Sequence, residues 1–276
     1  MTYKSFNVTL TDNIAHIVLS RPEKRNAMST DFWEDLPKII TDIDNNAKAR
    51  VIVISSTGPL FSAGIDISML GLNAPKDNNN NNPHYGVNFY TLIKRLQNAF
   101  SSLENCRIPV LVAIHGGCYG GGVDLITACD MRYGTEDSFI TIYEINVGMT
   151  ADVGTFPRIL NHMPEGVVRE LAYTGRKMGA DECKARGLYN EVYKDQATML
   201  EAVMATAKEI ASKSPLAVYG CKHAITYGRD HNTEDALDYI GVWNMSMLIP
   251  SEMQEAIIAS QEKRTGQFAE LPKIKP

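Results

Sequence analysis

The sequence predicts an α/β fold, with a core of alternating strands and helices followed by a helical C-terminal region. Two apolar runs, Val51–Ser55 and Val110–Ile114, have the continuous hydrophobicity of strands buried on both faces of a parallel sheet. From Val167 onward, helical patterns dominate the sequence. Strands that alternate with helices, followed by helices alone, are typical of an α/β core with a helical tail.

The composition fits one main domain with an appendage. The 276 residues are 44% hydrophobic and 21% charged, which is sufficient for a substantial core. The net charge is −5 and no basic run stands out, so nucleic acid is not expected as a partner. No stretch approaches the roughly 18 apolar residues that indicate a membrane span, and no membrane association is expected.

The cysteines and the N-terminus predict a cytoplasmic protein. The five cysteines are odd in number and widely spread without a CxxC pair, which indicates free thiols in a reducing compartment. The N-terminal residues have neither the apolar core of a signal peptide nor the Arg-rich pattern of a transit peptide. His115 lies near Cys118 and Cys129, but the spacing matches no standard zinc pattern, so no metal is expected.

The first expected elements are a hairpin and a helix. Residues Asn7–Leu19 alternate around a turn at Thr11–Asn13, as two antiparallel strands do. Ser29 or Thr30 can then cap a helix over about Asp31–Asn45.

A loop, an insertion and a helix follow the Val51–Ser55 strand. The loop is Phe61–Asp66, which contains a glycine. Residues 73–86 include five consecutive asparagines, Asn78–Asn82, and such polar low-complexity sequence predicts a mobile surface insertion. The next segment, Tyr90–Leu103, has apolar residues near helical spacing.

The segment after Val110–Ile114 indicates an anion-binding turn. The glycine-rich run Gly116–Gly122 leads into a predicted helix at Val123–Cys129, whose start presents unpaired backbone N–H groups. With a second donor from the loop Ser62–Asp66, these groups could form an oxyanion hole. Close packing of helix against strand explains the glycines equally well. A nucleotide loop and a serine hydrolase are disfavoured, because G-x-G-x-x-G, Gly-Lys-Ser/Thr and G-x-S-x-G are absent.

Three carboxylates lie where α/β folds tend to place chemistry. Asp124 comes three residues after Gly121, Glu144 follows a strand predicted at Ser138–Ile142, and Asp152 lies in the next loop. Each carboxylate alone is more often an ordinary solvated or capping acid. Their placement near the expected N–H donors favours a shared proton-transfer site.

Three motifs in order carry a family resemblance: Arg21–Met28, Phe61–Asp66 and Ile114–Arg158. With them, the chain resembles the crotonase (enoyl-CoA hydratase/isomerase) superfamily from about residue 6 to past residue 264. The resemblance implies a crotonase-like spiral of ββα repeats with a helical C-terminal trimerisation region, assembled as a homotrimer or as a homohexamer built from two trimers. We therefore expect a spiral core at residues 1–199 and an oligomerisation region at residues 200–276. In that region, core or subunit contacts are expected of Met245, Met247, Leu248 and Met253.

The resemblance also implies a site for acyl-CoA, a thioester substrate, with no cofactor. The backbone N–H groups of Ile65 and Gly121 would hold the thioester oxygen, and the Ala27 carbonyl would accept a hydrogen bond from the adenine. Lys263 would approach the CoA phosphate of a neighbouring subunit. The full set of expected CoA-binding residues is Lys24, Arg25, Ala27, Ala63, Asp66 and Ile67.

The carboxylate set selects between activities of the superfamily. Enoyl-CoA hydratases generally have glutamates at the positions of Asp124 and Glu144, and a small uncharged residue at that of Asp152. The present set is similar instead to the dienoyl-CoA isomerases, which convert 3,5-dienoyl-CoA to 2,4-dienoyl-CoA in fatty acid β-oxidation. Under this hypothesis Glu144 takes the α proton, a protonated Asp152 delivers one to the ε carbon, and Asp124 orients the site, although donor and acceptor could be exchanged. The alternatives are an enoyl-CoA hydratase that uses Asp124 and Glu144, and an inactive CoA-binding assembly subunit.

Overall fold

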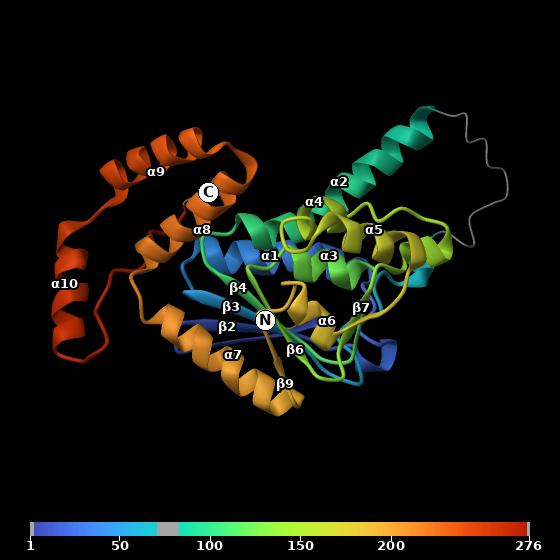
Figure 1. Ribbon diagram of the computed structural model, residues 1–276, viewed down its shortest axis with the longest axis horizontal. Helices are drawn as coiled ribbons and strands as arrows, with labels where there is room; N and C mark the ends of the chain where they lie inside the picture. The colour runs from blue at the N-terminus through green and yellow to red at the C-terminus, as the bar shows by residue number, and fades with distance from the viewer. Residues whose placement is uncertain (1–2, 71–82, 275–276) are drawn as a thin grey trace.

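The computed structural model describes residues 3–70 and 83–274, and it has the predicted α/β core with a helical C-terminal region (Figure 1). Most of the insertion predicted at residues 73–86 lies outside the described residues. For the last four residues of the insertion the prediction was wrong, because they belong to helix α2. This helix runs from Pro83 to Asn105 and so begins well before the expected start at Tyr90. Proline is compatible with the first turn of a helix, where its missing N–H has no intrahelical partner.

The larger sheet has six strands in the order β1-β2-β3-β4-β6-β9, of which only the β1–β2 pair is antiparallel. The predicted hairpin is confirmed, and Asp12 and Asn13 turn between β1 and β2 with positive φ angles of 53° and 62°. Aspartate and asparagine tolerate positive φ angles and therefore favour the two-residue turn of a β-hairpin. The strands are β1 Phe6–Thr11, β2 Ile14–Leu19, β3 Val51–Ser56, β4 Val110–Ile114, β6 Met131–Thr135 and β9 Glu191–Tyr193.

A smaller sheet of three short strands, in the order β5-β7-β8, lies beside the larger one. Its strands are β5 Gly117–Tyr119, β7 Phe139–Thr141 and β8 Met178–Gly179. The chain passes from β4 to β5 to helix α3 (Gly121–Thr127), and then from β6 to β7 to helix α4 (Thr155–Ile159). The chain thus repeats a unit of two strands, one in each sheet, followed by a helix, which is the expected ββα repeat.

The remaining helices cover the sheets and form the C-terminal region. They are α1 Thr30–Asn45, α5 Glu165–Thr174, α6 Ala180–Ala185, α7 Gln196–Ala211, α8 Pro215–Asp230, α9 Thr233–Met247 and α10 Pro250–Gln261. The described residues also form the short 3-10 helices η1 Pro22–Lys24, η2 Ile67–Leu70 and η3 Tyr143–Val147.

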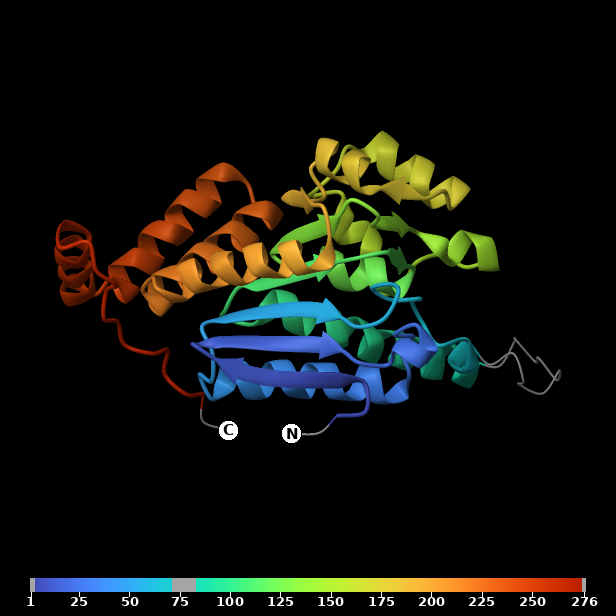
Figure 2. The same ribbon diagram turned by 90° about the horizontal axis from the view of Figure 1, so that it is seen from below.

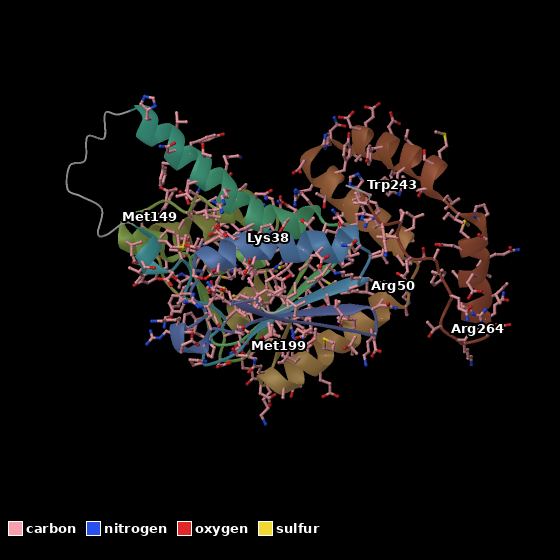
Figure 3. All side chains as sticks on the ribbon, turned by 180° about the vertical axis from the view of Figure 1, so that it is seen from behind. Lys38, Arg50, Met149, Met199, Trp243 and Arg264 are labelled. Atoms are coloured by element: carbon pink, nitrogen blue, oxygen red, sulfur yellow. The ribbon has the colours of Figure 1, made fainter. Side chains whose placement is uncertain are left out.

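Strand β3 shows why the larger sheet is apolar on both faces. Val51 and Val53 pack in one cluster with α7, whereas Ile52 and Ile54 pack in another cluster with α1 and α2. Alternate residues of a strand point to opposite faces, so the continuous apolar run supplies both clusters. Met199, from α7, is labelled in Figure 3 and belongs to the first cluster.

The C-terminal helices α9 and α10 extend away from the sheets (Figures 1 and 2). Helix α8 is attached to the core by the buried Lys222, which donates to the backbone oxygens of Leu103 and Ile108 and pairs with Asp130 at 2.9 Å. The part of the chain that the structure describes contains no helix long and apolar enough to cross a membrane.

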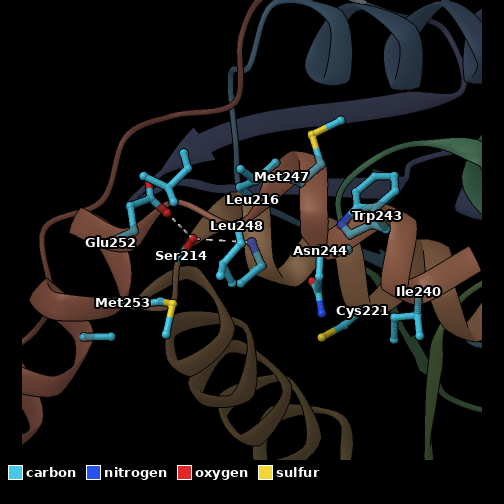
Figure 4. Close-up of a pocket in the computed structure, with 14 residues that line it drawn as sticks. Ser214, Leu216, Cys221, Ile240, Trp243, Asn244, Met247, Leu248, Glu252 and Met253 are labelled. Carbon is cyan, nitrogen blue, oxygen red and sulfur yellow. Dashed lines mark hydrogen bonds between the residues drawn. The ribbon is translucent and has the colours of Figure 1, made fainter. Parts of the chain in front are cut away.

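The methionine-rich group of α9 and α10 is not part of the core. Met245 is 81% exposed, and Met247, Leu248 and Met253 are exposed as well, so the alternative of core packing was wrong. The last three residues line a pocket of about 330 Å³ between α8, α9 and α10 (Figure 4). Subunit contact remains the prediction for this group. The division of the chain at residue 199 also remains a prediction.

Candidate active site

Two backbone segments approach each other closely at the expected oxyanion hole. The loop before η2 is held against Met28, whose N–H donates to the Gly64 oxygen at 2.8 Å. A Cβ atom placed on Gly64 would lie 2.8 Å from the Tyr119 oxygen and 3.3 Å from the Gly121 nitrogen. A Cβ atom placed on Gly121 would lie 3.6 Å from the Ile65 nitrogen. The nitrogens of Ile65 and Gly121 are therefore neighbours, and the glycines at positions 64 and 121 permit this approach.

Both of these N–H groups are available to a ligand. Gly121 is the first residue of α3, where an N–H has no intrahelical acceptor. Gly120 precedes it with a φ of 48°, a left-handed conformation that glycine adopts without strain. Among the described residues, the Ile65 N–H likewise has no acceptor, since its neighbours Gly64 and Asp66 make the bonds to Met28. The pair can thus donate two hydrogen bonds to one oxygen atom.

Asp124 lies on α3 one turn after this pair and is 1% exposed. Its Oδ1 atom accepts hydrogen bonds from the Thr155 N–H at 2.6 Å and from the Thr155 hydroxyl at 2.8 Å. Burial raises the pKa of Asp124 to about 6, the two bonds from Thr155 oppose that rise, and the nearby Asp152 adds to it. The result is a buried carboxylate with one oxygen already bonded.

Glu144 follows β7, as predicted, and lies in the first turn of η3. Its Oε1 atom packs against Gly120, where an added Cβ would lie 3.1 Å away. Its Oε2 atom is buried and has no hydrogen-bond partner in the described chain. Burial raises the pKa of Glu144 to about 7, with further contributions from the negative charges of Asp124 and Asp152. A carboxylate in this state is a good general base near neutrality.

Asp152 is half-buried in the loop before α4, as predicted. Burial raises the pKa of its carboxyl group above the ordinary value. Its backbone oxygen accepts a hydrogen bond from the Gln97 amide of α2 at 2.7 Å. A pocket of about 460 Å³ adjoins it, lined also by Arg158 and Arg229.

The structure brings the three expected carboxylates together. The charge of Asp152 affects the pKa of Asp124, and both aspartates affect the pKa of Glu144. Glu144 packs on Gly120, directly before the donor Gly121, so the cluster borders the two N–H groups. Like charges in a buried site favour retention of a proton by at least one of the groups. The arrangement can remove and return protons beside an oxygen that gains negative charge.

The segment expected to hold CoA lies at the surface next to this site. The Ala63 N–H donates to the Arg25 oxygen at 2.9 Å, and the Asp66 N–H donates to the Met28 oxygen at 3.1 Å. The Ala27 carbonyl already accepts a hydrogen bond from Arg21 at 2.9 Å, which leaves one lone pair for a ligand. The exposed members of the set are Lys24, Arg25, Ala63 and Ile67.

Lys263 is separated from this segment within one chain. It follows α10, and its neighbour Arg264 lies at the far end of the C-terminal helices in Figure 3. The role expected for Lys263 concerned a neighbouring subunit and stays a prediction.

Three residues of the site were not singled out from the sequence. Thr155 lies within the third motif, and membership of that motif was its only signal. Gln97 is distant in sequence from Asp152, so no local pattern could connect them. Arg158 pairs with Glu104 at 3.1 Å and lies against Gly154, so that it supports the loop that carries Asp152.

Comparisons with known proteins agree with this geometry. The family model described as enoyl-CoA hydratase/isomerase matches residues 9–271. The chain is 40% identical to the mitochondrial Δ(3,5)-Δ(2,4)-dienoyl-CoA isomerase of Rattus norvegicus, over 99% of this chain and 84% of the relative. It is 38% identical to the peroxisomal isomerase of the same name from Arabidopsis thaliana, over 94% of each chain. The crystal structure of an enoyl-CoA hydratase from Bacillus anthracis has a TM-score of 0.85 at 26% identity, covering 99% of this chain and all of the other.

These relatives contradict the expected cytoplasmic location. The rat protein is named as mitochondrial and the Arabidopsis protein as peroxisomal. The cytoplasmic expectation was drawn from the unpaired cysteines and from the absence of a recognisable targeting pattern, and neither feature determines location.

The family match covers nearly the whole chain, and it agrees with the fold and with the N–H donors and carboxylates of the site. The chain therefore belongs to the enoyl-CoA hydratase/isomerase family and is an enzyme of that family.

Proposed function

We propose that this enzyme converts 3,5-dienoyl-CoA to 2,4-dienoyl-CoA in fatty acid β-oxidation. The observation that carries the proposal is the presence of three clustered carboxylates, rather than two, beside the Ile65 and Gly121 N–H groups. The relatives that bear the name of this activity match nearly the whole chain, which supports the same choice.

The first step is removal of the α proton by Glu144. The electron pair of the broken C–H bond passes into the diene and the thioester carbonyl, and the carbonyl oxygen becomes negative. The N–H groups of Ile65 and Gly121 bind that charged oxygen more strongly than the neutral one, which lowers the barrier. A Glu144 pKa of about 7 suits this role, because the carboxylate is available and sufficiently basic at neutral pH.

The second step is protonation of the ε carbon by Asp152. The extended enolate returns its electron pair to form the new C–H bond, and the double bonds move to positions 2 and 4. Burial raises the pKa of Asp152, which favours the protonated form that this step needs. Asp124 takes neither proton and orients the site. After each turnover Glu144 holds a proton that Asp152 has lost, so the two must exchange it directly or through solvent.

CoA binding and assembly complete the proposal. The residues that hold CoA are Lys24, Arg25, Ala27, Ala63, Asp66 and Ile67, with Lys263 contributed to a neighbouring subunit. No cofactor takes part. The enzyme assembles as a homotrimer or as a homohexamer through α8, α9 and α10, whose exposed apolar residues support such contact.

Hydration of 2-enoyl-CoA, a lyase reaction, is the less favoured alternative. Asp124 and Glu144 could orient a water, but this reaction gives Asp152 no task.

The test is to supply the purified enzyme with a 3,5-dienoyl-CoA and, separately, with crotonyl-CoA. The rise of 2,4-diene absorbance measures isomerisation, and the loss of enoyl absorbance measures hydration. We expect rapid isomerisation with little hydration. Fast hydration without formation of the conjugated diene would overturn the proposal, and a protein that binds both esters without turnover would be an assembly subunit.

A further inference from the structure

Thr155 connects two of the three carboxylates. It is the first residue of α4, it is 1% exposed, and it lies three residues after Asp152. Its N–H and its hydroxyl both donate to Oδ1 of Asp124, at 2.6 Å and 2.8 Å. The loop that carries Asp152 is thereby joined to the helix that carries Asp124.

The two donors act on one oxygen and distinguish between protonation states. An N–H and an O–H that donate to the same atom stabilise an ionised carboxylate more than a neutral one. Within the described residues, the only hydrogen bonds to the Asp124 carboxylate are the two from Thr155, both to Oδ1. Direct stabilisation of the ionised form therefore comes from Thr155. The backbone N–H is present in any variant, whereas the hydroxyl is specific to threonine or serine.

We propose that Thr155 is a positioning residue that keeps Asp124 as the fixed anion of the site, so that the exchangeable proton resides on Glu144 and Asp152. This inference rests on the proposed function. Asp124 in turn raises the basicity of Glu144 through its negative charge, so Thr155 acts on the base without touching the substrate.

The other groups around Asp124 are accounted for. Asp152 in the loop opposes ionisation of Asp124, and Arg158 of α4 favours it. Glu144 of η3 interacts with Asp124, and Cys118 of β5 stays a neutral thiol because burial raises its pKa. Arg158 already pairs with Glu104 of α2, so its charge is largely compensated. The hydroxyl of Thr155 is the group that can be removed without changing any charge.

The expected consequence is a change in the pH dependence of catalysis. If both Asp124 and Glu144 must be ionised, loss of the hydroxyl makes Asp124 retain a proton to higher pH. If the Asp124 pKa rises by about one unit, the acidic limb of the kcat/KM profile of Thr155→Val becomes steeper and moves to higher pH, with about a fivefold loss at pH 6 that disappears at high pH. KM changes little, because the CoA segment is untouched. Thr155→Ser retains a hydroxyl and behaves like the wild type.

The experiment compares Thr155→Val and Thr155→Ser with Thr127→Val. Thr127 is a buried threonine of the same helix as Asp124, but its hydroxyl donates to backbone oxygens, the nearer being that of Val123 at 2.9 Å. Thr127→Val should leave the pH profile in place. An unshifted profile for Thr155→Val, or an equal shift for Thr127→Val, would overturn the proposal. If Thr155→Val does not fold, Thr155→Ala removes the same hydroxyl without placing an additional methyl group against the Asp124 carboxylate.

A second readout separates this inference from the proposed function. Carbon-13 NMR of the aspartate carboxyl groups, with Asp124 assigned by its absence in Asp124→Asn, measures the titration of Asp124 directly. We expect its midpoint to rise in Thr155→Val and not in Thr155→Ser. A wild type that does not isomerise dienes would refute the function, yet this titration would still support or refute the role of Thr155.

Discussion

At Glu144 the chemistry of the site opposes the stability of the fold. Its Oε2 atom is buried without a hydrogen-bond partner, and its pKa is raised from 4.5 to about 7. The folded state therefore binds more protons than the unfolded state between these pH values, and stability falls as the pH rises through that window. An enzyme can retain such a residue because the same burial that costs stability makes the carboxylate a stronger base.

Replacing Glu144 with glutamine should consequently stabilise the protein while abolishing turnover. Glu144 is partly exposed, so solvent screening reduces the gain at pH 8 to about 1–2 kcal/mol. This gain corresponds to a rise in Tm of about 2–6 °C. Calorimetry at pH 8 and at pH 4 checks the prediction, since the gain should vanish at the lower pH, where Glu144 is protonated in both states. A variant less stable than the wild type at pH 8 would contradict it.

A site residue was predictable from the sequence when its partners lie near it along the chain, and was not predictable when its partners are distant. Asp124, Glu144 and Gly121 lie within one motif, so their type and order predicted a carboxylate cluster beside an N–H donor. The two bonds of Thr155 depend on the path of the loop before α4, which no local pattern defines. The same holds for Oε2 of Glu144, whose isolation is a property of packing.

At the scale of elements, α2 controls the loop of Asp152. Gln97 donates to the Asp152 backbone oxygen, and Arg158 bonds to Ser101 and pairs with Glu104, both on the same helix. The helix therefore restrains the loop from outside the catalytic cluster. A displaced loop would move the proton donor away from the ε carbon without altering CoA binding.

Gln97→Ala should lower kcat for diene isomerisation by about tenfold and leave KM nearly unchanged, since a small misplacement of a reacting group has a large effect on rate. Asn98→Ala is the matched control, because Asn98 is the next residue of α2 and is exposed. Steady-state kinetics of both variants decide the matter. Equal kcat values for the two variants would show that the restraint from α2 is unimportant.

Long apolar strands and amphipathic helices were predictable, and short elements were not. Strands β3 and β4 are short apolar runs, rich in β-branched residues, that are buried on both faces, and such runs are typical of a parallel sheet. Strand β5 has three residues in a glycine-rich run, and β6 contains the charged Arg132, so neither shows a strand pattern. Arg132 is nevertheless buried, because it donates to the backbone oxygens of Leu188 and Cys129. Tertiary hydrogen bonds of this kind override the local pattern.

At the scale of the whole molecule, the C-terminal helices expose several large apolar side chains to solvent. Met245 on α9, Leu248 directly after α9 and Ile257 on α10 are exposed. Surfaces of this kind usually mark an interface. The proposed assembly of three or six copies would cover them.

Met245→Glu should weaken this assembly, because burying an unpaired carboxylate in an interface is costly. Sedimentation velocity should show a wild-type oligomer, a dissociated Met245→Glu variant and an intact Met245→Leu control. Circular dichroism should report an unchanged fold in all three. A monomeric wild type, or an intact Met245→Glu oligomer, would contradict the proposed interface.

The direct test of the central claim follows the α proton separately from product formation. In D₂O, Asp152→Asn should still exchange the α protons of 3,5-dienoyl-CoA through Glu144, as proton NMR detects, but should form almost no 2,4-diene. Glu144→Gln should do neither. The reverse pattern, with α exchange retained in Glu144→Gln and lost in Asp152→Asn, would contradict the assignment of base and acid.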